Sequence, residues 1–331
     1  MKLIRGNKEH IFKEDRPFNS CHASTLISGS EGDNDEILAA WFGGSEEGAG
    51  DVAIWSSRWK NEKWSDPVKI ADSKGIPHWN PVLFKSNSGK VYLFYKVGHE
   101  IPEWKTMVTT SDEGYSWSKP EPLVEGDRGG RGPVKNKPII SEDGTWLAPA
   151  SVETEDKWNA FVDISCDQGK TWEKSDMVPL KREAQFNNKN ISNNKNKEMP
   201  VPDQSFSGKG VIQPTLWESE PGKVHMLLRS TESCIYRSDS KDGGQTWCTA
   251  YPTDLPNNNS GIDITRLDNG NLVLAYNPVG KNWGPRTPLV LSISKDNGQT
   301  WEEGYILENE EGEYSYPAII SKNNEVYVTY T

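Results

Sequence analysis

Four copies of one eight-residue pattern, Ser/Thr-x-Asp-x-Gly-x-Ser/Thr-Trp, limit the folds open to this chain more than any other feature. They begin at Thr110, Ser165, Ser240 and Ser294, and a fifth, decayed copy runs from residue 57 to residue 64. The pattern is typical of a β-hairpin turn, in which Asp accepts amide hydrogen bonds, Gly allows a positive φ, and Thr and Trp favour the next strand. The closing tryptophans of successive copies lie 53, 55, 75 and 54 residues apart. This spacing indicates a repeat of about four short strands.

A second repeat gives the number of units. Each copy contains a short strand of alternating aliphatic residues that starts with Gly, Asp or Asn, as at residues 89–93 and 270–274. Another strand precedes each copy, and in four of the six its second residue is Pro, which suits the start of a strand because Pro donates no ladder hydrogen bond. The six preceding strands begin with His22, Asn80, Lys137, Gln213, Ser260 and Tyr316. Six small sheets predict an all-β, six-bladed β-propeller that occupies residues 1–331 as a single domain.

One segment breaks the repeat. The 75-residue interval contains a stretch rich in Asn and Lys that also includes Pro200 and Pro202. We predict a long surface loop at about 184–208, with a solvated loop favoured over a lid on one face.

Composition narrows the classes of partner. A net charge of −11 and a pI near 5.1 argue against nucleic acid or an anionic membrane surface. The sequence has no apolar run of membrane-spanning length, and its first residues lack the hydrophobic core of a signal peptide. Four cysteines without CxxC spacing predict free thiols and a cytoplasmic location. Five scattered histidines predict no metal site, and we expect no cofactor and a monomer.

The strand-leading residues should surround one mouth of a central channel, because they occupy equivalent positions in the repeat. A second ring is expected from the strand of each unit that starts with Gly, Asp or Asn. Its members lie seven residues after that starting residue, at Phe42, Lys96, Ser151, Arg229, Asn277 and Thr331. Polar and titratable side chains predominate in both rings, whereas packing alone needs small or apolar ones. We interpret the rings as a ligand site; the alternative is a polar lining that holds water.

These motifs resemble the Asp-box, or bacterial neuraminidase repeat, family of sialidases and sialidase-like proteins. The resemblance covers almost the whole chain. It is most specific near the end, where Arg286-Thr-Pro-Leu precedes the last Asp box and Glu313-Tyr-Ser-Tyr-Pro-Ala-Ile follows it. Leu227-Leu-Arg229-Ser, ahead of the box at Ser240, is similar to another arginine-bearing segment of the family.

In that family three arginines bind the substrate carboxylate, a Tyr paired with a Glu is the nucleophile, and an Asp is the acid/base. The resemblance implies that Arg229 and Arg286 bind a carboxylate, that Tyr316 is the nucleophile, with Tyr314 as the alternative register, and that Asp51 is the acid/base. A guanidinium pairs with a carboxylate through two parallel hydrogen bonds, and a neutral phenol attacks an anionic sugar without charge repulsion.

Two positions depart from the family pattern. The first unit begins His22-Ala-Ser where sialidases have Arg-Ile-Pro, and Gln213 stands where the Glu partner of the Tyr is expected. A neutral amide cannot take the phenol proton. Both the arginine triad and the Tyr/Glu pair are therefore incomplete. His22 becomes a candidate acid/base or charge neutraliser, because the ordinary pKa of histidine is close to neutral pH; the alternative is that it caps a strand.

The sequence thus predicts a sialidase-like, exo-acting glycoside hydrolase that removes a terminal acidic sugar from oligosaccharides. The first alternative is a lyase acting on uronate-linked sugars, in which His22 or Tyr316 abstracts the proton α to the carboxylate. Gln213 and the two arginines would neutralise the acid. The second alternative is a non-catalytic glycan-binding propeller. Further candidate substrate-binding residues are Lys137, Asn80, Lys96, Arg131 and Glu153; for Arg131 an ordinary solvated loop is the alternative.

Overall fold

The computed structural model describes residues 6–29, 36–127, 129–181, 208–323 and 325–331. These segments fold into β-strands and connecting loops, which confirms the all-β prediction, and they include one turn of 3-10 helix, η1 (Ile101–Glu103). The loop predicted at about 184–208 falls on residues 182–207, which lie outside the described residues. Within the described segments, no helix is long and apolar enough to cross a membrane.

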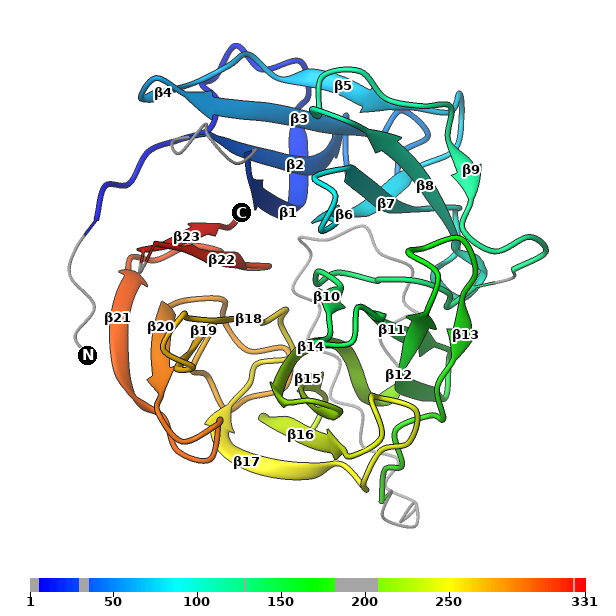
Figure 1. Ribbon diagram of the computed structural model, residues 1–331. Helices are drawn as coiled ribbons and strands as arrows, with labels where there is room; N and C mark the ends of the chain where they lie inside the picture. The colour runs from blue at the N-terminus through cyan, green and yellow to red at the C-terminus, as the bar shows by residue number, and fades with distance from the viewer. Residues whose placement is uncertain (1–5, 30–35, 128, 182–207, 324) are drawn as a thin grey trace.

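Strands pair in chain order, and successive sheets lie side by side around a common centre (Figure 1). The first sheet contains β1 (Ser20–Ser28), β2 (Ile37–Gly44), β3 (Ala53–Lys60), β4 (Lys63–Trp64) and β5 (Val68–Ala71). The second contains β6 (His78–Lys85), β7 (Val91–Val97), β8 (Lys105–Ser111) and β9 (Glu121–Pro122).

The third sheet consists of two successive groups of strands. The first group is β10 (Ile139–Ile140), β11 (Trp146–Glu153), β12 (Lys157–Ser165) and β13 (Glu173–Lys174). The second is β14 (Lys209–Glu220), β15 (Lys223–Ser230), β16 (Cys234–Ser240) and β17 (Tyr251–Pro256). A short parallel pairing of β12 with β14 joins them, with Trp158 opposite Gly210.

The last two sheets complete the described chain. One contains β18 (Asp263–Arg266), β19 (Leu272–Tyr276), β20 (Leu289–Ser294) and β21 (Glu302–Glu308), and the other contains β22 (Ala318–Lys322) and β23 (Glu325–Thr329). β22 contacts both β18 and β1, so the last sheet lies beside the first. Figure 1 shows the resulting ring of sheets.

Each strand pair expected from the second sequence repeat is present and antiparallel. The pairs are β1–β2, β6–β7, β10–β11, β14–β15, β18–β19 and β22–β23. The first strand of each pair lies nearest the centre of the ring (Figure 1). The residues that start these strands are therefore the ones that the fold brings together.

Three of the Asp-box turns close through the same hydrogen bonds. Asp167 accepts the amide of Thr171 at 2.9 Å and its hydroxyl at 2.6 Å, and Asp242 and Asp296 bind the threonine four residues on in the same way. These bonds, the threonine hydroxyl first, lower the pKa of Asp167 to about 2. The aspartates are turn residues, as the pattern predicts.

Aromatic side chains fill the space between neighbouring sheets. Trp146 of β11 meets Phe84 of β6 edge to face, with ring centroids 4.7 Å apart. Trp172, which closes the Asp box that starts at Ser165, lies 6.4 Å from Trp146. All three rings are buried, and burial of one such side chain stabilises the fold by about 1.5–3 kcal/mol. The repeated tryptophans thus hold adjacent repeats together.

Two arginines add a polar clamp between neighbouring repeats. Arg58 of β3 donates to the carbonyl oxygen of Glu113 at 2.7 Å, and Arg237 of β16 donates to that of Asn297 at 2.8 Å. Both carbonyls belong to the fourth residue of an Asp-box pattern. Each arginine therefore links one unit to the turn of a later one.

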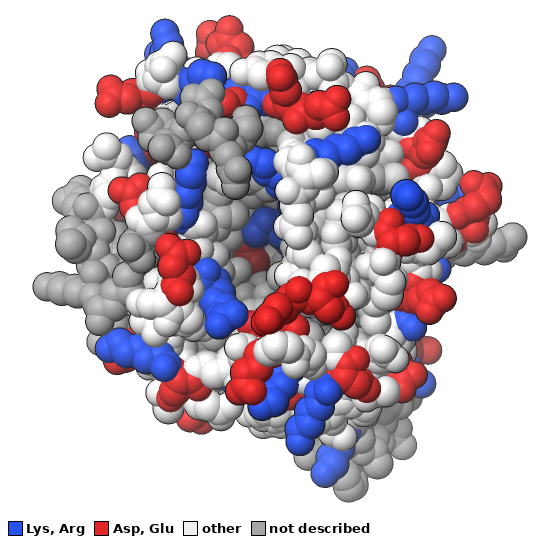
Figure 2. Space-filling view, in the orientation of Figure 1, with Lys and Arg blue, Asp and Glu red and all other residues white. Residues whose placement is uncertain are grey.

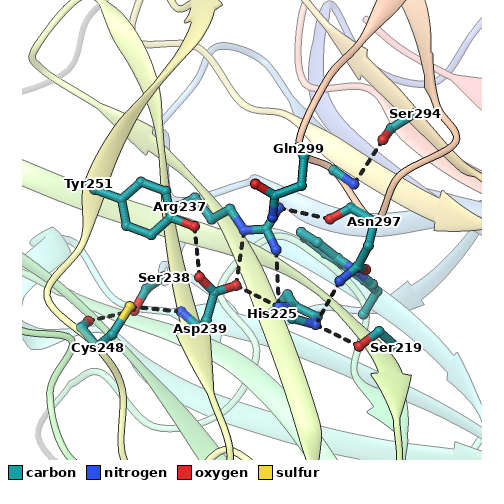
Figure 3. Close-up of polar contacts among 12 residues, drawn as sticks. Ser219, His225, Arg237, Ser238, Asp239, Cys248, Tyr251, Ser294, Asn297 and Gln299 are labelled. Carbon is teal, nitrogen blue, oxygen red and sulfur yellow. Dashed lines mark hydrogen bonds and ion pairs between the residues drawn. The ribbon is translucent and has the colours of Figure 1, made fainter.

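A hydrogen-bonded network surrounds the second clamp (Figure 3). The two ring nitrogens of His225 contact Asp239 at 2.5 Å and the hydroxyl of Ser219 at 2.7 Å. The side-chain oxygen of Asn297 accepts from the indole of Trp217, so its amide nitrogen donates to His225, at 3.1 Å. Every polar group named here has a partner, which is the pattern of a structural contact between sheets.

Candidate active site

A β-bulge interrupts the first strand of three units at the same place. The register shifts in β1, β6 and β14, and the bulge contains a left-handed residue: Ala23 (φ 54°), Asn80 (φ 40°) or Gln213 (φ 52°). Tyr316, two residues before β22, has a φ of 50°. Non-glycine residues adopt this conformation rarely, and both bulges and strained residues concentrate at functional sites.

The bulges correct the alignment of His22 with the other strand-leading residues. His22 pairs with Phe42 as Ile212 pairs with Arg229, so His22 is equivalent to Ile212. Ala23 takes the bulge position that the sequence comparison gives to His22. The comparison is wrong by one residue because this strand lacks the proline that follows Asn80, Gln213 and Tyr316 at the equivalent position.

The same correction applies to two other units. The ladder of β18 with β19 places Gly261, rather than Ser260, at the bulge position. Extended backwards, the ladder of β10 with β11 places Lys135 there, two residues before Lys137. Lys137-Pro138 has the same residue pattern as the other strand starts, but it lies two residues after the bulge position, which Lys135 occupies.

Arg229 connects the residues that the structure brings together. Its Nη1 donates to the phenol oxygen of Tyr316 at 2.8 Å and to Oε1 of Gln213 at 3.0 Å, while Nε donates to Asn259 at 2.8 Å. The Gln213 amide nitrogen also lies 3.5 Å from the Tyr316 oxygen. Arg229 is only 4% exposed, and its Nη2 makes no hydrogen bond to a described residue. It therefore keeps donor capacity for an anion.

Three aromatic rings surround the Arg229 guanidinium. The centroids of Trp158, Trp283 and Tyr316 lie 5.7, 5.8 and 5.9 Å from its Cζ. Trp158 is buried, whereas Trp283 is 39% exposed and has a left-handed backbone (φ 54°). These rings fix the guanidinium in place and favour its charge through cation–π attraction.

His22 packs directly on Tyr316, with ring centroids 4.4 Å apart. Burial, together with the charges of Arg286, Arg229 and Lys135, lowers the pKa of His22 to about 3. The imidazole is therefore neutral at physiological pH. An anion bound to the two arginines would offset part of this effect and make His22 a stronger base.

Arg286 approaches Tyr316 from another side. Its Cζ lies 5.6 Å from the Tyr316 ring centroid, and Nη1 donates to Glu313 at 2.5 Å and to Ser315 at 3.2 Å. Glu313 orients the guanidinium while leaving other donors. The sequence prediction that Arg229, Arg286, Tyr316, His22 and Gln213 lie close together agrees with this geometry.

Asp51 is held on the surface near the first sheet. Its carboxylate accepts the hydroxyl of Ser45 at 2.8 Å and the amide of the same residue, and these bonds lower its pKa. Glu47, in the same loop, is half-buried; burial raises its pKa, while the charge of Arg286 opposes the shift. Glu47 is thus the carboxyl of this loop whose pKa is raised and that interacts electrostatically with Arg286.

Two predicted substrate-binding residues bond to the protein itself. Lys96 donates to Thr106 and to the carbonyl of Arg131, both at 2.6 Å, and burial lowers its pKa to about 8. The Arg131 guanidinium pairs with buried Asp163 at 2.8 Å and donates to the Trp172 carbonyl. Arg131 is therefore not a solvated loop residue. None of its contacts with described residues is with Arg229.

Asn80 and Glu153 keep polar atoms that make no hydrogen bond to described residues. Asn80 occupies the bulge of β6. Glu153 ends β11, where burial raises its pKa and the charges of Arg229 and Lys96 oppose the rise. Both remain candidates for contact with a ligand.

Lys137 lies in a different place from the Arg229 cluster. Its ammonium forms an ion pair with Asp263, and both line a cavity of about 460 Å³ that also includes Thr215. Neither Arg229 nor Tyr316 lines this cavity. Figure 2 shows that the molecule is hollowed at the centre of the ring, with basic and acidic side chains around the opening.

Sequence reasoning missed several residues that complete the cluster. They are Asn259, which orients Arg229, Trp158, Glu47, and the buried pair Lys135–Asn136. The run Asn257-Asn258-Asn259 and the Lys135-Asn136 pair are buried polar residues in the loops that precede strands, and their place in the repeat was clear only once the bulges fixed the alignment. Among the described residues, no group of three or more His, Cys, Asp or Glu is arranged to hold a metal ion.

Comparison with known proteins agrees with this architecture. A model of the BNR repeat-like domain matches residues 35–328. No curated protein matches the sequence.

Solved structures with a similar fold include sialidases. The Hadza microbial sialidase Hz136 has a TM-score of 0.70 and 16% identity, over 91% of this chain and 61% of its own. The chain thus spans less than two thirds of that protein. NanB sialidase from Streptococcus pneumoniae has a TM-score of 0.71 and 14% identity, over 97% and 67%. A protein of unknown function from Dyadobacter fermentans has a TM-score of 0.71 and 17% identity, over 94% and 90%. At these identities the likeness concerns the fold.

Proposed function

The chain belongs to the BNR repeat-like family, and from that premise we propose that it is a sialidase-like, exo-acting glycoside hydrolase that removes a terminal acidic sugar from oligosaccharides. We further propose that its six strand pairs are the inner strands of six propeller blades in one domain. The substrate is an acidic oligosaccharide, and no nucleic acid or membrane takes part.

The observation that carries this proposal is the position of two arginines beside Tyr316. Arg229 bonds to the phenol oxygen at 2.8 Å, and Arg286 lies 5.6 Å from the ring centroid. Arg286 already pairs with Glu313, whereas none of the described ion pairs gives Arg229 a carboxylate partner, so the charge of Arg229 favours an added anion. A sugar carboxylate has the charge and the planar, two-oxygen shape that guanidinium groups bind best.

Hydrolysis needs a proton donor to the leaving oxygen and a group that meets the developing cation. Tyr316 supplies the second, and the hydrogen bond from Arg229 stabilises negative charge on its oxygen. For the first, Glu47 is better suited than Asp51, because burial raises the pKa of Glu47 whereas hydrogen bonds to Ser45 lower that of Asp51. The glycosidic C–O bond breaks as Glu47 protonates the leaving oxygen, and water then adds to the sugar.

One observation favours a second candidate, a uronate lyase. The phenol oxygen of Tyr316 bonds to Arg229 and Gln213, and none of its described partners is a carboxylate. The neutral His22 ring lies against the same phenol. In elimination, one of these two groups takes the proton α to the carboxylate and the other protonates the leaving oxygen, so a C=C bond forms as the C–O bond breaks.

Product analysis on sialyl conjugates and uronate-terminated oligosaccharides separates these functions. Hydrolysis releases the acidic sugar with one water added and no new absorbance, whereas elimination produces a double bond conjugated to the carboxylate. A Tyr316→Phe variant should lose turnover in either case, and a Tyr251→Phe variant, altered on the sheet edge near Asp239, should keep it. Binding of acidic glycans without turnover by the wild type would overturn both enzymatic proposals.

A further inference from the structure

Lys135 makes three hydrogen bonds across the centre of the molecule. Its buried ammonium donates to the Asn136 side-chain oxygen at 2.9 Å, to the Ile262 carbonyl at 3.2 Å and to the Pro317 carbonyl. Ile262 follows Gly261 at the start of the fifth unit, and Pro317 follows Tyr316 at the start of the sixth. One side chain therefore connects three units of the repeat.

Asn136 extends this contact to the fourth unit. Its side-chain nitrogen donates to the carbonyls of Gln213 at 3.1 Å and Pro214 at 3.0 Å. Both of its amide hydrogens and its oxygen are thereby used, and the residue is 1% exposed. The pair Lys135–Asn136, named here the central brace, holds the backbone at Gln213 and at Pro317, the residue that follows Tyr316. The side chains of Gln213 and Tyr316 meet on Arg229.

The hydrogen bonds of the central brace form a closed set. Three acceptors around one nitrogen need three N–H groups, so only the ammonium form of Lys135 satisfies all of them. Removing either brace residue leaves buried carbonyls without a donor, each of which costs about 1–3 kcal/mol. The left-handed conformations of Gln213 and Tyr316 are themselves unfavourable and persist only where neighbouring contacts fix them.

Gly261 leaves the space that this arrangement needs. A Cβ at this position would lie 3.1 Å from Cε of Lys135 and 3.4 Å from Cγ of Tyr316. The lysine stem and the tyrosine ring thus pack against the same point of the backbone. A single methyl group there would crowd the lysine stem and lie in van der Waals contact with the tyrosine ring.

We propose that the central brace positions Tyr316 and Gln213 on Arg229, so that Lys135 and Asn136 are positioning residues of the site. The kinetic part of this inference rests on the proposed function; the structural part does not. Displacement of a reacting group by about 1 Å can lower a rate by about 100-fold. The expected effect of breaking the brace is therefore on turnover rather than on substrate binding.

Crystal structures of Lys135→Met and Asn136→Leu test the geometry without any substrate. The proposal expects the 2.8 Å contact between the Tyr316 oxygen and Arg229 Nη1 to be lost and the φ of residue 316 or 213 to leave the left-handed region. Lys85→Met is the matched control, since Lys85 also donates to a backbone carbonyl, that of Gly29, at 2.5 Å. Unchanged geometry in both brace variants would overturn the proposal.

Kinetics on an acidic oligosaccharide give the second test. Lys135→Met should lower kcat by about 100-fold with KM within about three-fold, whereas Lys85→Met should keep both values near those of the wild type. A kcat near that of the wild type in Lys135→Met, or a change in KM as large as that in kcat, would overturn the positioning role. If Lys135→Met does not fold, Gly261→Ala takes its place in the test, because it keeps both brace residues. This variant should show the same loss of kcat. A wild type without turnover would contradict the proposed function alone, since the crystal structures still decide the brace.

Discussion

At the scale of single residues, Arg229 is the side chain on which the site depends. It bonds to Tyr316, Gln213 and Asn259 through Nη1 and Nε, and its Nη2 makes no hydrogen bond to a described residue. A lysine at this position has one charged nitrogen and no planar fork, so it cannot hold these partners and a carboxylate together.

Arg229→Lys should therefore lower kcat/KM by at least about 100-fold, which corresponds to about 2.7 kcal/mol of lost transition-state stabilisation. Steady-state kinetics on an acidic oligosaccharide measure this change. Arg237→Lys alters a clamp at the Asn297 turn instead and should keep kcat/KM within about two-fold. Equal losses in both variants would show that the effect is on folding.

His22 gives the protein a predictable response to pH. Its pKa is about 3 in the native protein and about 6.5 in an unfolded chain. Between these values the unfolded chain binds more protons, so the free energy of unfolding falls as pH decreases from about 6.5 towards 3, by up to about 1.4 kcal/mol per pH unit. Above pH 6.5 both states are neutral and His22 contributes no slope.

Urea unfolding of His22→Gln at pH 7.5 and pH 5 tests this expectation. The variant should lose less stability between the two pH values than the wild type, since Gln does not titrate. His99→Gln changes an exposed histidine and should keep the wild-type slope. A slope in His22→Gln equal to that of the wild type would contradict the burial-induced shift.

From the sequence alone, the types of residue in the site were predicted better than their places in the repeat. Arg229, Arg286 and Tyr316 follow motifs that survive in the linear sequence, and the structure brings them together. Lys135 was overlooked because each of its contacts to Ile262 and Pro317 spans more than 100 residues and involves only backbone carbonyls. Because every residue has a backbone carbonyl, a contact with one cannot be predicted from the type of the partner residue.

At the scale of elements, the Asp-box turns and the bulges differ in how readily the sequence predicts them. The turns require Asp, Gly and Thr at fixed spacing, so the sequence predicts them directly. The bulges require only one left-handed residue, and Ala23, Asn80, Gln213 and Tyr316 share no side-chain chemistry. The pairing ladder was needed to align the units, which is why His22, Lys137 and Ser260 were misaligned.

Two matched glycines test whether the arginine clamp crowds its turn. Gly244 and Gly298 occupy the same Asp-box position with φ of 88° and 75°. A Cβ on Gly244 meets nothing closer than 3.6 Å, whereas one on Gly298 lies 3.0 Å from Nη1 of Arg237. Both alanine variants incur the left-handed penalty of about 1–2 kcal/mol, and Gly298→Ala should lose further stability.

Urea unfolding of the two variants measures the difference. We expect Gly298→Ala to be less stable than Gly244→Ala by about 1 kcal/mol, the cost of a strained or displaced contact. In a background where Arg237 is already Ala, the difference between the two glycine variants should shrink, and what remains is due to Trp217, whose Cζ2 would lie 3.2 Å from the same Cβ. Equal losses with Arg237 in place would mean that the clamp tolerates the added methyl group.

At the scale of the whole molecule, the repeat predicts the strand pairs but not how the units join. All six pairs form, yet β12 and β14 also pair in parallel and merge two units into one sheet. β14 lies within the long interval between Trp172 and Trp247, and residues 182–207 of that interval lie outside the described residues. A regular repeat contains no information about an irregular connection.

The whole molecule also explains how an acidic protein can bind an anion. The net charge of −11 is spread over the chain, whereas Arg229 and Arg286 converge beside one tyrosine. Local pairing at short range outweighs distant charges, which are screened beyond about 10 Å at ordinary ionic strength. The global charge therefore argues against polyanions as partners and leaves an acidic sugar possible as a ligand.

The most direct test of this account compares an acidic oligosaccharide with the same molecule after its terminal carboxylate has been reduced to an alcohol. The account predicts that the acidic form is cleaved at its terminal sugar and that the reduced form is cleaved at least about 100-fold more slowly, because Arg229 and Arg286 lose their charged partner. Equal cleavage of the two forms, or preference for the reduced one, would contradict carboxylate recognition by these arginines.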